Sequence, residues 1–365
     1  MTEEFLNIDT DLEAFIREGR SFAFYRIPGE KKFSFLTQST NVNVQTYQDI
    51  KDLNGTCGFI VAPFRVTENC PVVLIQPDEV MSYDLPMGDV QNDKEDTDHL
   101  LWSKEEQCFD DYQSCFTTFI KALHGRRFDK LVLSRSQTIQ RDSSFGLLSA
   151  FFTACGMYTH SYVYLAYTPQ TGVWLGSTPE VLLSGERLNY YTVALAGTQS
   201  IINGVLPDEW DEKNRQEQEF VAQYIRKQLH SLGILPHERG PFPAFAGTLS
   251  HLKTEFDFCL SNEQLLGDLL ALLHPTPAVC GLPKESAYQF ILDHEGYDRR
   301  YYSGFVGWLN PKGKTDIYVN LRCMQIGDKE LTLYAGGGLL ASSDLADEWT
   351  ETEKKLQTMK RISIS

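Results

Sequence analysis

Apolar residues recur along this 365-residue chain with two different spacings. Short alternating or continuous apolar runs, rich in Val, Leu, Tyr and Phe, predict strands at 21–26, 58–63, 130–139, 162–167, 173–175, 181–183 and 188–196. Three further strands are expected at 304–309, 316–326 and 331–335. Apolar residues at helical spacing predict helices at 11–18, 105–124, 209–230, 262–273, 284–293 and 344–359.

The order of these elements indicates the fold class. Strands and helices do not alternate strictly, so we expect an α+β fold with large, mostly antiparallel sheets flanked by helices. The acidic segment 83–98 has no long apolar run and is typical of a loop or linker. Since no Pro- or Gly-rich linker follows it, we expect one domain over residues 101–365.

Charge and composition narrow the function. The formal net charge of −16 argues against nucleic acid or an anionic membrane surface as a partner. An acidic protein that handles an anionic ligand must place cations locally or recruit a metal. No apolar stretch of about 18 residues suggests a membrane helix. The acidic N-terminus and eight scattered cysteines without a C-x-x-C pair favour a cytoplasmic protein with buried, reduced thiols.

Two C-terminal features could bind ions. In the helix after Ser342, Glu348, Glu351 and Lys355 stand at positions i, i+3 and i+7 and share one face, which suits either a hard cation site or a solvated charged surface. The run 336–338 consists of three glycines between a strand and that helix. Its amides could approach an anion closely, or it could form only a tight turn.

Three further charged residues are candidates for chemistry. Lys130 opens a strand, where an inward-facing ammonium group could lose its proton and act as a base, although an exposed lysine fits the pattern too. Glu180 follows a strand and precedes an apolar run, so it is either an acid of raised pKa or a turn carboxylate. Glu217 lies in a highly charged helix, most of which must face solvent.

Seven sequence blocks occur in a specific order. They are FDKLVLSR at 128–135, GSTPEVLL at 176–183, ALAGT at 194–198, HPTPAVCG at 274–281, YDRRYYSGFVGW at 297–308, VNLRCMQI at 319–326 and AGGGLLASSDLADEWTETEKK at 335–355. Over residues 100–360 this series resembles the chorismate-utilising enzymes, which include anthranilate synthase component I, aminodeoxychorismate, isochorismate and salicylate synthases. The resemblance implies their fold, with a chorismate-binding catalytic domain over residues 101–365 and with residues 1–100 as a more variable N-terminal part of the same fold.

Two positions select the nucleophile within that family. The ammonia-dependent members usually carry Gln where Lys130 stands, and aminodeoxychorismate synthases often carry a nucleophilic Lys where this chain has Ala196. The resemblance therefore implies an isochorismate synthase, in which water attacks C2 of chorismate while the C4 hydroxyl leaves. Lys130 would be the base, and Glu180 would be the acid that protonates the leaving group.

The resemblance also implies a ligand set. A Mg²⁺ ion would be held by Glu217 and Glu351, with Glu348 close by and bridging through water. The substrate would be bound by Gly197, Thr198, His251, Arg322, Gly336, Gly337 and Lys355. The departures from the family pattern are Gln218, where His is usual, and Gly296-Tyr297, where Pro-Phe is common.

Three alternatives remain open at this point. They are a salicylate synthase, a non-catalytic chorismate-binding subunit and an ammonia-dependent subunit that needs a glutaminase. We expect a monomer without a glutaminase subunit. Its product could feed menaquinone or siderophore synthesis, and the absence of a fused partner domain leads us to prefer menaquinone.

Overall fold

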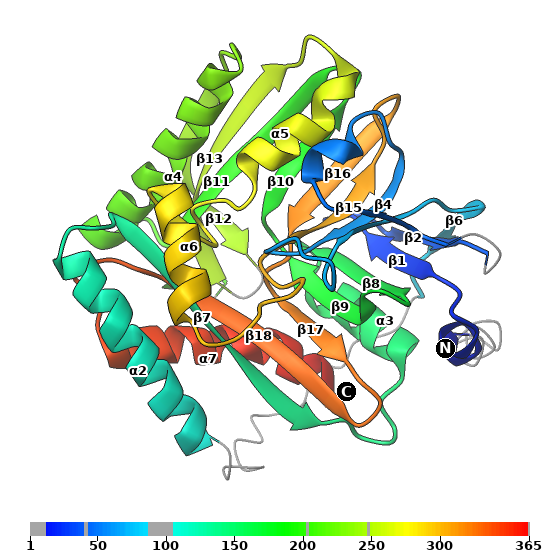
Figure 1. Cartoon of the computed structure of the whole chain (residues 1–365), viewed down its shortest axis with the longest axis horizontal. Coiled ribbons are helices and arrows are strands. Elements are labelled where there is room, and N and C mark those ends of the chain that lie inside the picture. The colour runs from blue at the N-terminus through cyan, green and yellow to red at the C-terminus, as the bar shows by residue number, and fades with distance from the viewer. Residues whose placement is uncertain (1–11, 40–42, 87–104, 202–203, 247–248, 364–365) are drawn as a thin grey trace.

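Two large antiparallel sheets form the body of the computed structural model, which describes residues 12–39, 43–86, 105–201, 204–246 and 249–363 (Figure 1). In spatial order, the first sheet contains β14 (Gly281–Leu282), β7 (Lys130–Gln140), β18 (Glu330–Leu339), β17 (Cys323–Ile326), β9 (Gly172–Thr178), β8 (Tyr162–Thr168), β1 (Phe22–Arg26), β2 (Lys32–Thr37) and β6 (Glu79–Asp84). The second contains β12 (His237–Ala246), β13 (Leu249–Cys259), β11 (Asn189–Ser200), β10 (Val181–Glu186), β16 (Lys314–Val319), β15 (Phe305–Leu309), β4 (Gly58–Ala62), β5 (Val72–Ile75) and β3 (Gln45–Tyr47). The predicted fold class is confirmed.

Helices cover the outer faces of both sheets. On the first sheet, α2 (Glu105–His124) and α6 (Lys284–His294) pack on β7, α7 (Leu345–Ser363) packs on β18, and α3 (Leu147–Met157) packs on β8 (Figure 1). On the second sheet, α4 (Glu212–Ser231) packs on β11 and α5 (Leu266–Leu273) packs on β10. Short 3₁₀ turns lie at η1 (Ile50–Leu53) and η2 (Glu263–Leu265), and residues 12–18 are also helical.

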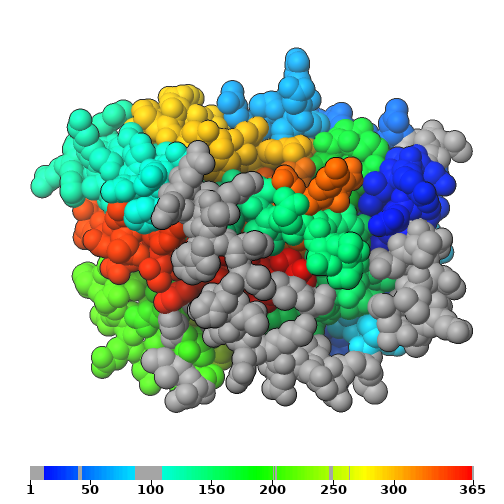
Figure 2. Space-filling model, turned by 90° about the horizontal axis from the view of Figure 1, so that it is seen from below, coloured from blue at the N-terminus to red at the C-terminus, as the bar shows by residue number. Residues whose placement is uncertain are grey.

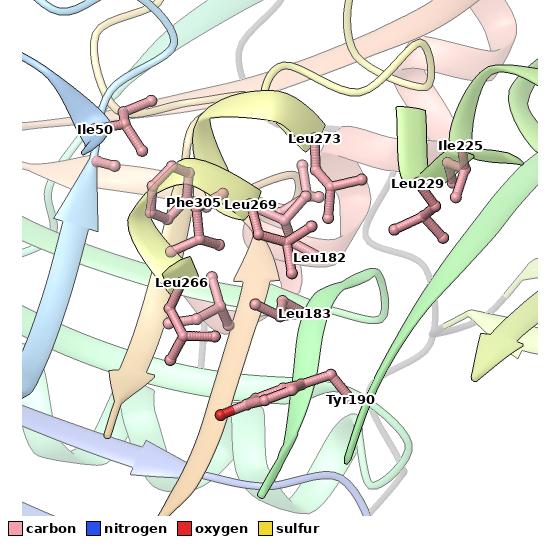
Figure 3. Packing of buried hydrophobic residues seen from close by; sticks show 14 of the residues in the cluster. Ile50, Leu182, Leu183, Tyr190, Ile225, Leu229, Leu266, Leu269, Leu273 and Phe305 are labelled. Carbon is pink, nitrogen blue, oxygen red and sulfur yellow. The ribbon is translucent and has the colours of Figure 1, made fainter. Parts of the chain in front are cut away.

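The second sheet and its helices enclose an aliphatic core. In Figure 3, leucines of α5 and α4 point toward Leu182 and Leu183 of β10, and Phe305 of β15 lies beside them. These side chains are almost fully buried. Burial of one such side chain contributes roughly 1.5–3 kcal/mol, so this cluster fixes α4 firmly on the sheet.

The two sheets share a different, aromatic core. Tyr162 of β8 stacks on Tyr318 of β16 with ring centroids 4.2 Å apart, and Trp174 of β9 stacks on Tyr334 of β18 at 5.5 Å. All four belong to one buried cluster. Because Tyr162 and Tyr318 come from different sheets, their contact helps to hold the sheets together.

The chain passes between the sheets at two neighbouring points. β9 of the first sheet leads through Pro179 and Glu180 into β10 of the second, and β16 of the second leads through 320–322 into β17 of the first. Backbone hydrogen bonds tie these links together, since the Val319 N–H donates to the Glu180 carbonyl and the Ser177 N–H donates to the Arg322 carbonyl. The links place Glu180 and Arg322 at the junction of the sheets.

Several predicted elements need correction. The expected strand 316–326 is two strands in different sheets, because the chain crosses at 320–322. The run 336–338 is not a turn but the end of β18, paired with 132–134 of β7. The helix α3 and the hairpin β12–β13 were not predicted. Of the acidic segment 83–98, residues 83–84 belong to β6, while 87–98 lie outside the described residues.

The cysteines differ in part from expectation. The seven cysteines whose side chains the structure describes are free thiols. Of these, Cys70, Cys155, Cys280 and Cys323 are buried as expected. Cys57 and Cys259, however, are exposed. Within the described ranges no helix is both long and apolar enough to cross a membrane.

Candidate active site

A cavity opens where the two sheets join. Its lining comes from the β9–β10, α5–β14, α6–β15 and β16–β17 links and from β11, β13, β18, α4 and α7. It comprises Pro179, Glu180, Leu195, Ala196, Gly197, Thr198, Glu217, His251, Ala278, Tyr302, Leu321, Arg322, Tyr334, Ala335, Gly336, Gly338, Glu351 and Lys355. Nine of the twelve site residues expected from the sequence are in this set. The other three, Lys130, Gly337 and Glu348, lie directly behind it.

Lys130 is the first residue of β7 and is fully buried. Its Nζ lies 2.8 Å from Glu217 Oε1 of α4, without the angles of a hydrogen bond. The side chain runs along Gly338 so closely that a Cβ added there would lie 2.8 Å from Lys130 Cε and would overlap Glu217 Oε1. Gly338 therefore provides the space in which the Lys130–Glu217 pair meets the cavity.

Glu180 is a buried carboxyl group at the cavity wall, with 2% of its surface exposed. Burial raises its pKa to about 7, against the opposing influence of Lys130 and of the Thr276 hydroxyl, which donates to Glu180 Oε1 at 3.3 Å. At neutral pH a large fraction of Glu180 therefore carries a proton. A carboxyl group in this state can donate that proton to a leaving group.

Gly197 and Thr198 reach the cavity because of a bulge in β11. The pairing of β11 with β13 shifts between Ala196 and Thr198, and Gly197 at the bulge has φ +72°. A Cβ at Gly197 would lie 3.0 Å from the Asn214 carbonyl, and Asn214 Oδ1 accepts from the Thr198 N–H at 2.9 Å. The bulge turns Thr198 toward His251, with Thr198 Oγ1 3.4 Å from His251 Nδ1.

Arg322, Lys355 and the imidazole of His251 also line the cavity. Burial, together with Arg322 and Lys355, lowers the pKa of His251 well below its usual value, so the ring is neutral at physiological pH. Its Nε2 lies 3.4 Å from an Arg322 guanidinium nitrogen and can accept from it. Lys355 Nζ donates to the Gly336 carbonyl at 2.8 Å and to Glu351 Oε1 at 2.6 Å.

The glycines of β18 add backbone donors. The N–H groups of Ser134 and Val132 point away from β18, to Glu295 Oε1 and to the Cys280 carbonyl. Their partners Gly336 and Gly338 therefore form non-hydrogen-bonded pairs with β7 and turn their own N–H groups to the other edge, where β17 has already ended. Gly336 and Gly338 line the cavity, whereas Gly337 faces Glu348 and Glu351.

Three carboxylates from two helices, Glu217, Glu348 and Glu351, gather at one side of the cavity; we call them the carboxylate trio. Burial raises the pKa of Glu348, as does its neighbour Glu351. Burial also acts to raise the pKa of Glu351, but Lys355, with Lys213 and Arg322, outweighs it and holds this pKa below its usual value. Each carboxylate of the trio thus has a lysine against it.

The trio has the chemistry to hold a hard cation. Glu348 Oε2 is buried and has no hydrogen-bond partner in the described part of the chain. It would lie only 3.1 Å from a Cβ at Gly337, so this glycine leaves room beside the carboxylates. Across the described ranges, no three His, Cys, Asp or Glu side chains are already arranged as metal ligands. Mg²⁺, however, needs only one or two carboxylates and keeps several waters, so the residues fit this ion.

The comparison with protein families decides the class. Residues 64–363 match the model of the family described as chorismate binding enzyme. The chain belongs to the chorismate-binding enzyme family. This confirms the resemblance drawn from the seven sequence blocks.

Relatives within the chorismate-binding enzyme family agree with this assignment. The chain is 32% identical over 242 residues to isochorismate synthase EntC of Escherichia coli K12, covering 64% of this chain and 62% of that one. It is 28% identical over 309 residues to isochorismate synthase DhbC of Bacillus subtilis, covering 79% and 76%. The matched part thus spans less than two thirds of the E. coli relative's length.

Solved structures confirm the fold of the chorismate-binding enzyme family. The menaquinone-specific isochorismate synthase MenF of E. coli superimposes with a TM-score of 0.73 at 19% identity, covering 93% of this chain and 88% of that one. Anthranilate synthase component I of Streptococcus pneumoniae gives a TM-score of 0.67 at 15% identity, covering 93% and 89%.

Sequence reasoning missed some of the residues that line the cavity of this chain. Pro179, Ala278 and Tyr302 lie inside the blocks that carried the resemblance, so their position was the available signal. Leu321 lies inside the block 319–326 and had the same signal, whereas Tyr334 is an ordinary core residue by pattern that no signal distinguishes. Only the crossing of the chain between the sheets brings these residues to one cavity.

Proposed function

We propose that this chain is an isochorismate synthase that converts chorismate to isochorismate. Support comes from isochorismate synthases among its relatives and from the cavity between the sheets. The observation that carries the proposal is Glu180, a buried carboxyl group with a pKa near 7 on the same cavity as the Lys130–Glu217 pair. The reaction needs both an acid and a base, and these groups supply one of each.

The proposed reaction exchanges one hydroxyl for another. A water oxygen forms a bond to C2 of the ring, and Lys130 Nζ, in its neutral form, accepts the proton of that water. The electron pairs of the two ring double bonds each move one bond along the ring toward C4 as the C4–O bond breaks, and Glu180 transfers its proton to the departing hydroxyl, which leaves as water. Lys130 lies behind Glu217 and Gly338, so the attacking water is expected on the Glu217 side of the cavity.

The substrate's carboxylates need positive partners. Arg322 and Lys355 line the cavity, and the N–H groups of Gly336 and Gly338 point to the same unpaired edge of β18. Thr198 and the neutral His251 offer uncharged hydrogen-bond partners for a hydroxyl group. Gly337 then acts as a spacer for the carboxylate trio and not as a direct contact.

Mg²⁺ belongs to this proposal as the cofactor. Glu217 and Glu351 line the cavity and would hold the ion, with Glu348 behind them in reach through water. When bound, the ion supplies positive charge to a substrate carboxylate. It would also offset the negative charge that the trio places beside an anionic substrate.

Ala196 bears on the choice between nucleophiles. It lines the cavity, and its methyl group cannot act as the amine nucleophile that aminodeoxychorismate synthases often carry at this position. We therefore propose that the chain acts on chorismate without a glutaminase subunit. We also propose that it acts as a monomer in the cytoplasm. A salicylate synthase remains the second candidate, because the elimination of pyruvate from isochorismate would use the same kind of cavity.

Product analysis tests the proposal. Purified protein incubated with chorismate and Mg²⁺ should form isochorismate, separated by liquid chromatography, without ammonia and without accumulating fluorescent salicylate. Lys130→Ala should lower turnover by about 10²–10⁴-fold, while Mg²⁺ binding measured by calorimetry persists. The matched control Lys121→Ala, at an exposed position of α2, should remain active.

Three results would contradict the proposal. Sustained salicylate formation would favour a salicylate synthase, and product formation strictly dependent on ammonia would favour the ammonia-using class. Binding of chorismate without turnover under all these conditions would indicate a non-catalytic subunit. Near wild-type turnover of Lys130→Ala would show that the base has been assigned to the wrong residue.

A further inference from the structure

A lysine with no part in the proposed reaction lies against the carboxylate trio. Lys213 of α4 donates from Nζ to Glu348 Oε1 of α7 at 2.8 Å. It thereby joins the two helices that supply the trio. Figure 2 shows these helices at the same face of the molecule, with α7 in red between α2 in cyan and α4 in yellow-green.

Lys213 stands at an unfavourable place for a cation. It is the second residue of α4, and the first turn of a helix carries the positive end of the helix dipole. A lysine there is disfavoured locally, so its position must be compensated elsewhere. The compensation comes from Glu348 of the trio, whose Oε1 lies 2.8 Å from Lys213 Nζ.

The three lysines that pair with the carboxylate trio differ in how firmly their side chains are held. Lys130 is fully buried under Gly338, and Lys355, with 15% of its side chain exposed, donates to both Glu351 and the Gly336 carbonyl. Lys213 is 36% exposed, and Glu348 is its only recorded hydrogen-bond partner in the described part of the chain. Of the three lysines, Lys213 can therefore withdraw toward solvent at the lowest cost.

Loss of Lys213 would leave the carboxylate of Glu348 buried without a cation. Its side chain is 1% exposed, and it accepts from Lys213 and from the Ser343 hydroxyl at 2.6 Å, both through Oε1. Its other oxygen, Oε2, is the buried atom without a partner, and it points toward the space beside Gly337. One oxygen of Glu348 is thus paired within the protein, while the other is buried beside Gly337 without a hydrogen-bond partner in the described part of the chain.

We propose that Lys213 is an internal counter-cation that neutralises the carboxylate trio in the metal-free protein and competes with Mg²⁺ for it. This inference rests on the magnesium site of the proposed function and adds a residue that sets the affinity of that site. Two positive charges beside the same three carboxylates repel each other, so an ammonium group at Glu348 weakens binding of the ion. The protein then remains folded without metal and releases the ion readily.

The affinity for Mg²⁺ itself tests this proposal. Isothermal titration of the full chain with MgCl₂, without chorismate, should give about tenfold tighter binding for Lys213→Met than for the wild type, since one neighbouring positive charge is gone. Lys213→Gln retains a donor for Glu348 without the charge and should behave like Lys213→Met. Lys213→Arg retains the charge and should stay within roughly threefold of the wild type.

A melting experiment gives a second readout and guards against a folding defect. Without metal, Lys213→Met should melt at a lower temperature than the wild type, because Glu348 is left buried without its cation. Saturating MgCl₂ should then raise its melting temperature by more than it raises that of the wild type. Lys227→Met, at an exposed position of the same helix, is the matched control and should change neither quantity.

The outcomes separate this inference from the proposed function. Mg²⁺ affinity that is unchanged or weaker in both Lys213→Met and Lys213→Gln would overturn the counter-cation role, because a weaker affinity means that Lys213 only positions Glu348 as a ligand. If the wild type and all variants bind no Mg²⁺, the proposed magnesium site fails, and this inference fails with it. Tighter binding in the two uncharged variants, with Lys213→Arg near the wild type, supports it.

Discussion

At the scale of single residues, burial changes what a side chain can do. Glu180 and Glu348 are carboxyl groups of similar burial, and burial raises the pKa of both, although Glu348 accepts from a lysine and Glu180 accepts from a hydroxyl at 3.3 Å. The pKa of Glu180 therefore rises to about 7, which suits a general acid. Lys130 shows the complementary case, since its full burial contradicts the open alternative of an exposed lysine at a strand start.

The pH dependence of Glu180→Gln tests this acid. We expect kcat/KM of the wild type to fall as pH rises through about 7, because the protonated form is lost. Glu180→Gln should lose about 10²–10⁴-fold in kcat, and its residual activity should lack this decline. The exposed Glu68→Gln is the control. A wild-type decline that persists unchanged in Glu180→Gln would assign the titration to another group.

The raised pKa of Glu180 also predicts how the free energy of unfolding changes with pH. The folded pKa of about 7 lies above the ordinary 4.5, so between these values the unfolded chain loses a proton that the native state keeps. Glu180 therefore lowers the free energy of unfolding progressively as pH rises from about 4.5 to 7. Relative to the wild type, Glu180→Gln should gain about 3 kcal/mol between pH 4.5 and pH 8, measured by urea denaturation. No gain would mean that Glu180 is ionised in the native state.

At the scale of elements, strand β18 controls how closely charged side chains of β7, α4 and α7 approach the sheet. β18 ends in three glycines, and each faces a different neighbour: Gly336 faces Tyr302, Gly337 the carboxylates of α7, and Gly338 the Lys130–Glu217 pair. Side chains at these positions would separate α4 and α7 from the sheet. The glycine run therefore serves close packing of charged groups within a strand and not the reversal of the chain.

Gly338→Ala tests this role of β18. The added methyl would overlap Glu217 Oε1 and approach Lys130 Cε to 2.8 Å, so the ion pair must shift. We expect kcat/KM to fall by about 10²-fold and the free energy of unfolding to fall by about 1–3 kcal/mol. Gly125→Ala is the control, since its Cβ would meet no atom closer than 3.4 Å. Wild-type kinetics for Gly338→Ala would show that this spacing is unimportant.

At the scale of the whole molecule, the junction of the sheets creates the site. Glu180 and Arg322 lie on the two links that cross it, and carboxylates of helices from both sheets meet beside it. The aromatic core that joins the sheets, with Tyr162 stacked on Tyr318, lies under the same junction. Loss of this core should therefore loosen both sheets at once.

Tyr162→Ala tests the coupling of the sheets. Removing this fully buried ring should lower the free energy of unfolding by about 3–5 kcal/mol. The unfolding transitions followed by far-UV circular dichroism and by tryptophan fluorescence should still coincide, because the two sheets unfold together. The fluorescence reports on both sheets, since Trp174 lies in the first and Trp308 in the second. Leu235→Ala, at a side chain 82% exposed, is the control. Two separated transitions would show that the sheets unfold independently.

The sequence by itself determined the fold class, most helices and the identity of the central charged residues. Helix boundaries such as 105–124 follow from local apolar spacing, which does not depend on distant contacts. The seven ordered blocks determined the family, and they contain Lys130, Glu180 and Glu351. Their order along the chain is a one-dimensional property that needs no structure.

Only the tertiary structure decided how these residues act together. Local pattern could not show that 316–326 divides between two sheets or that 336–338 continues a strand, because both depend on which strands pair. The pKa of Glu180 and the contact of Lys213 with Glu348 likewise depend on burial and on neighbours far away in sequence. Spacing along the chain predicts which residues share a face, but only packing decides what that face meets and how far water is excluded from it.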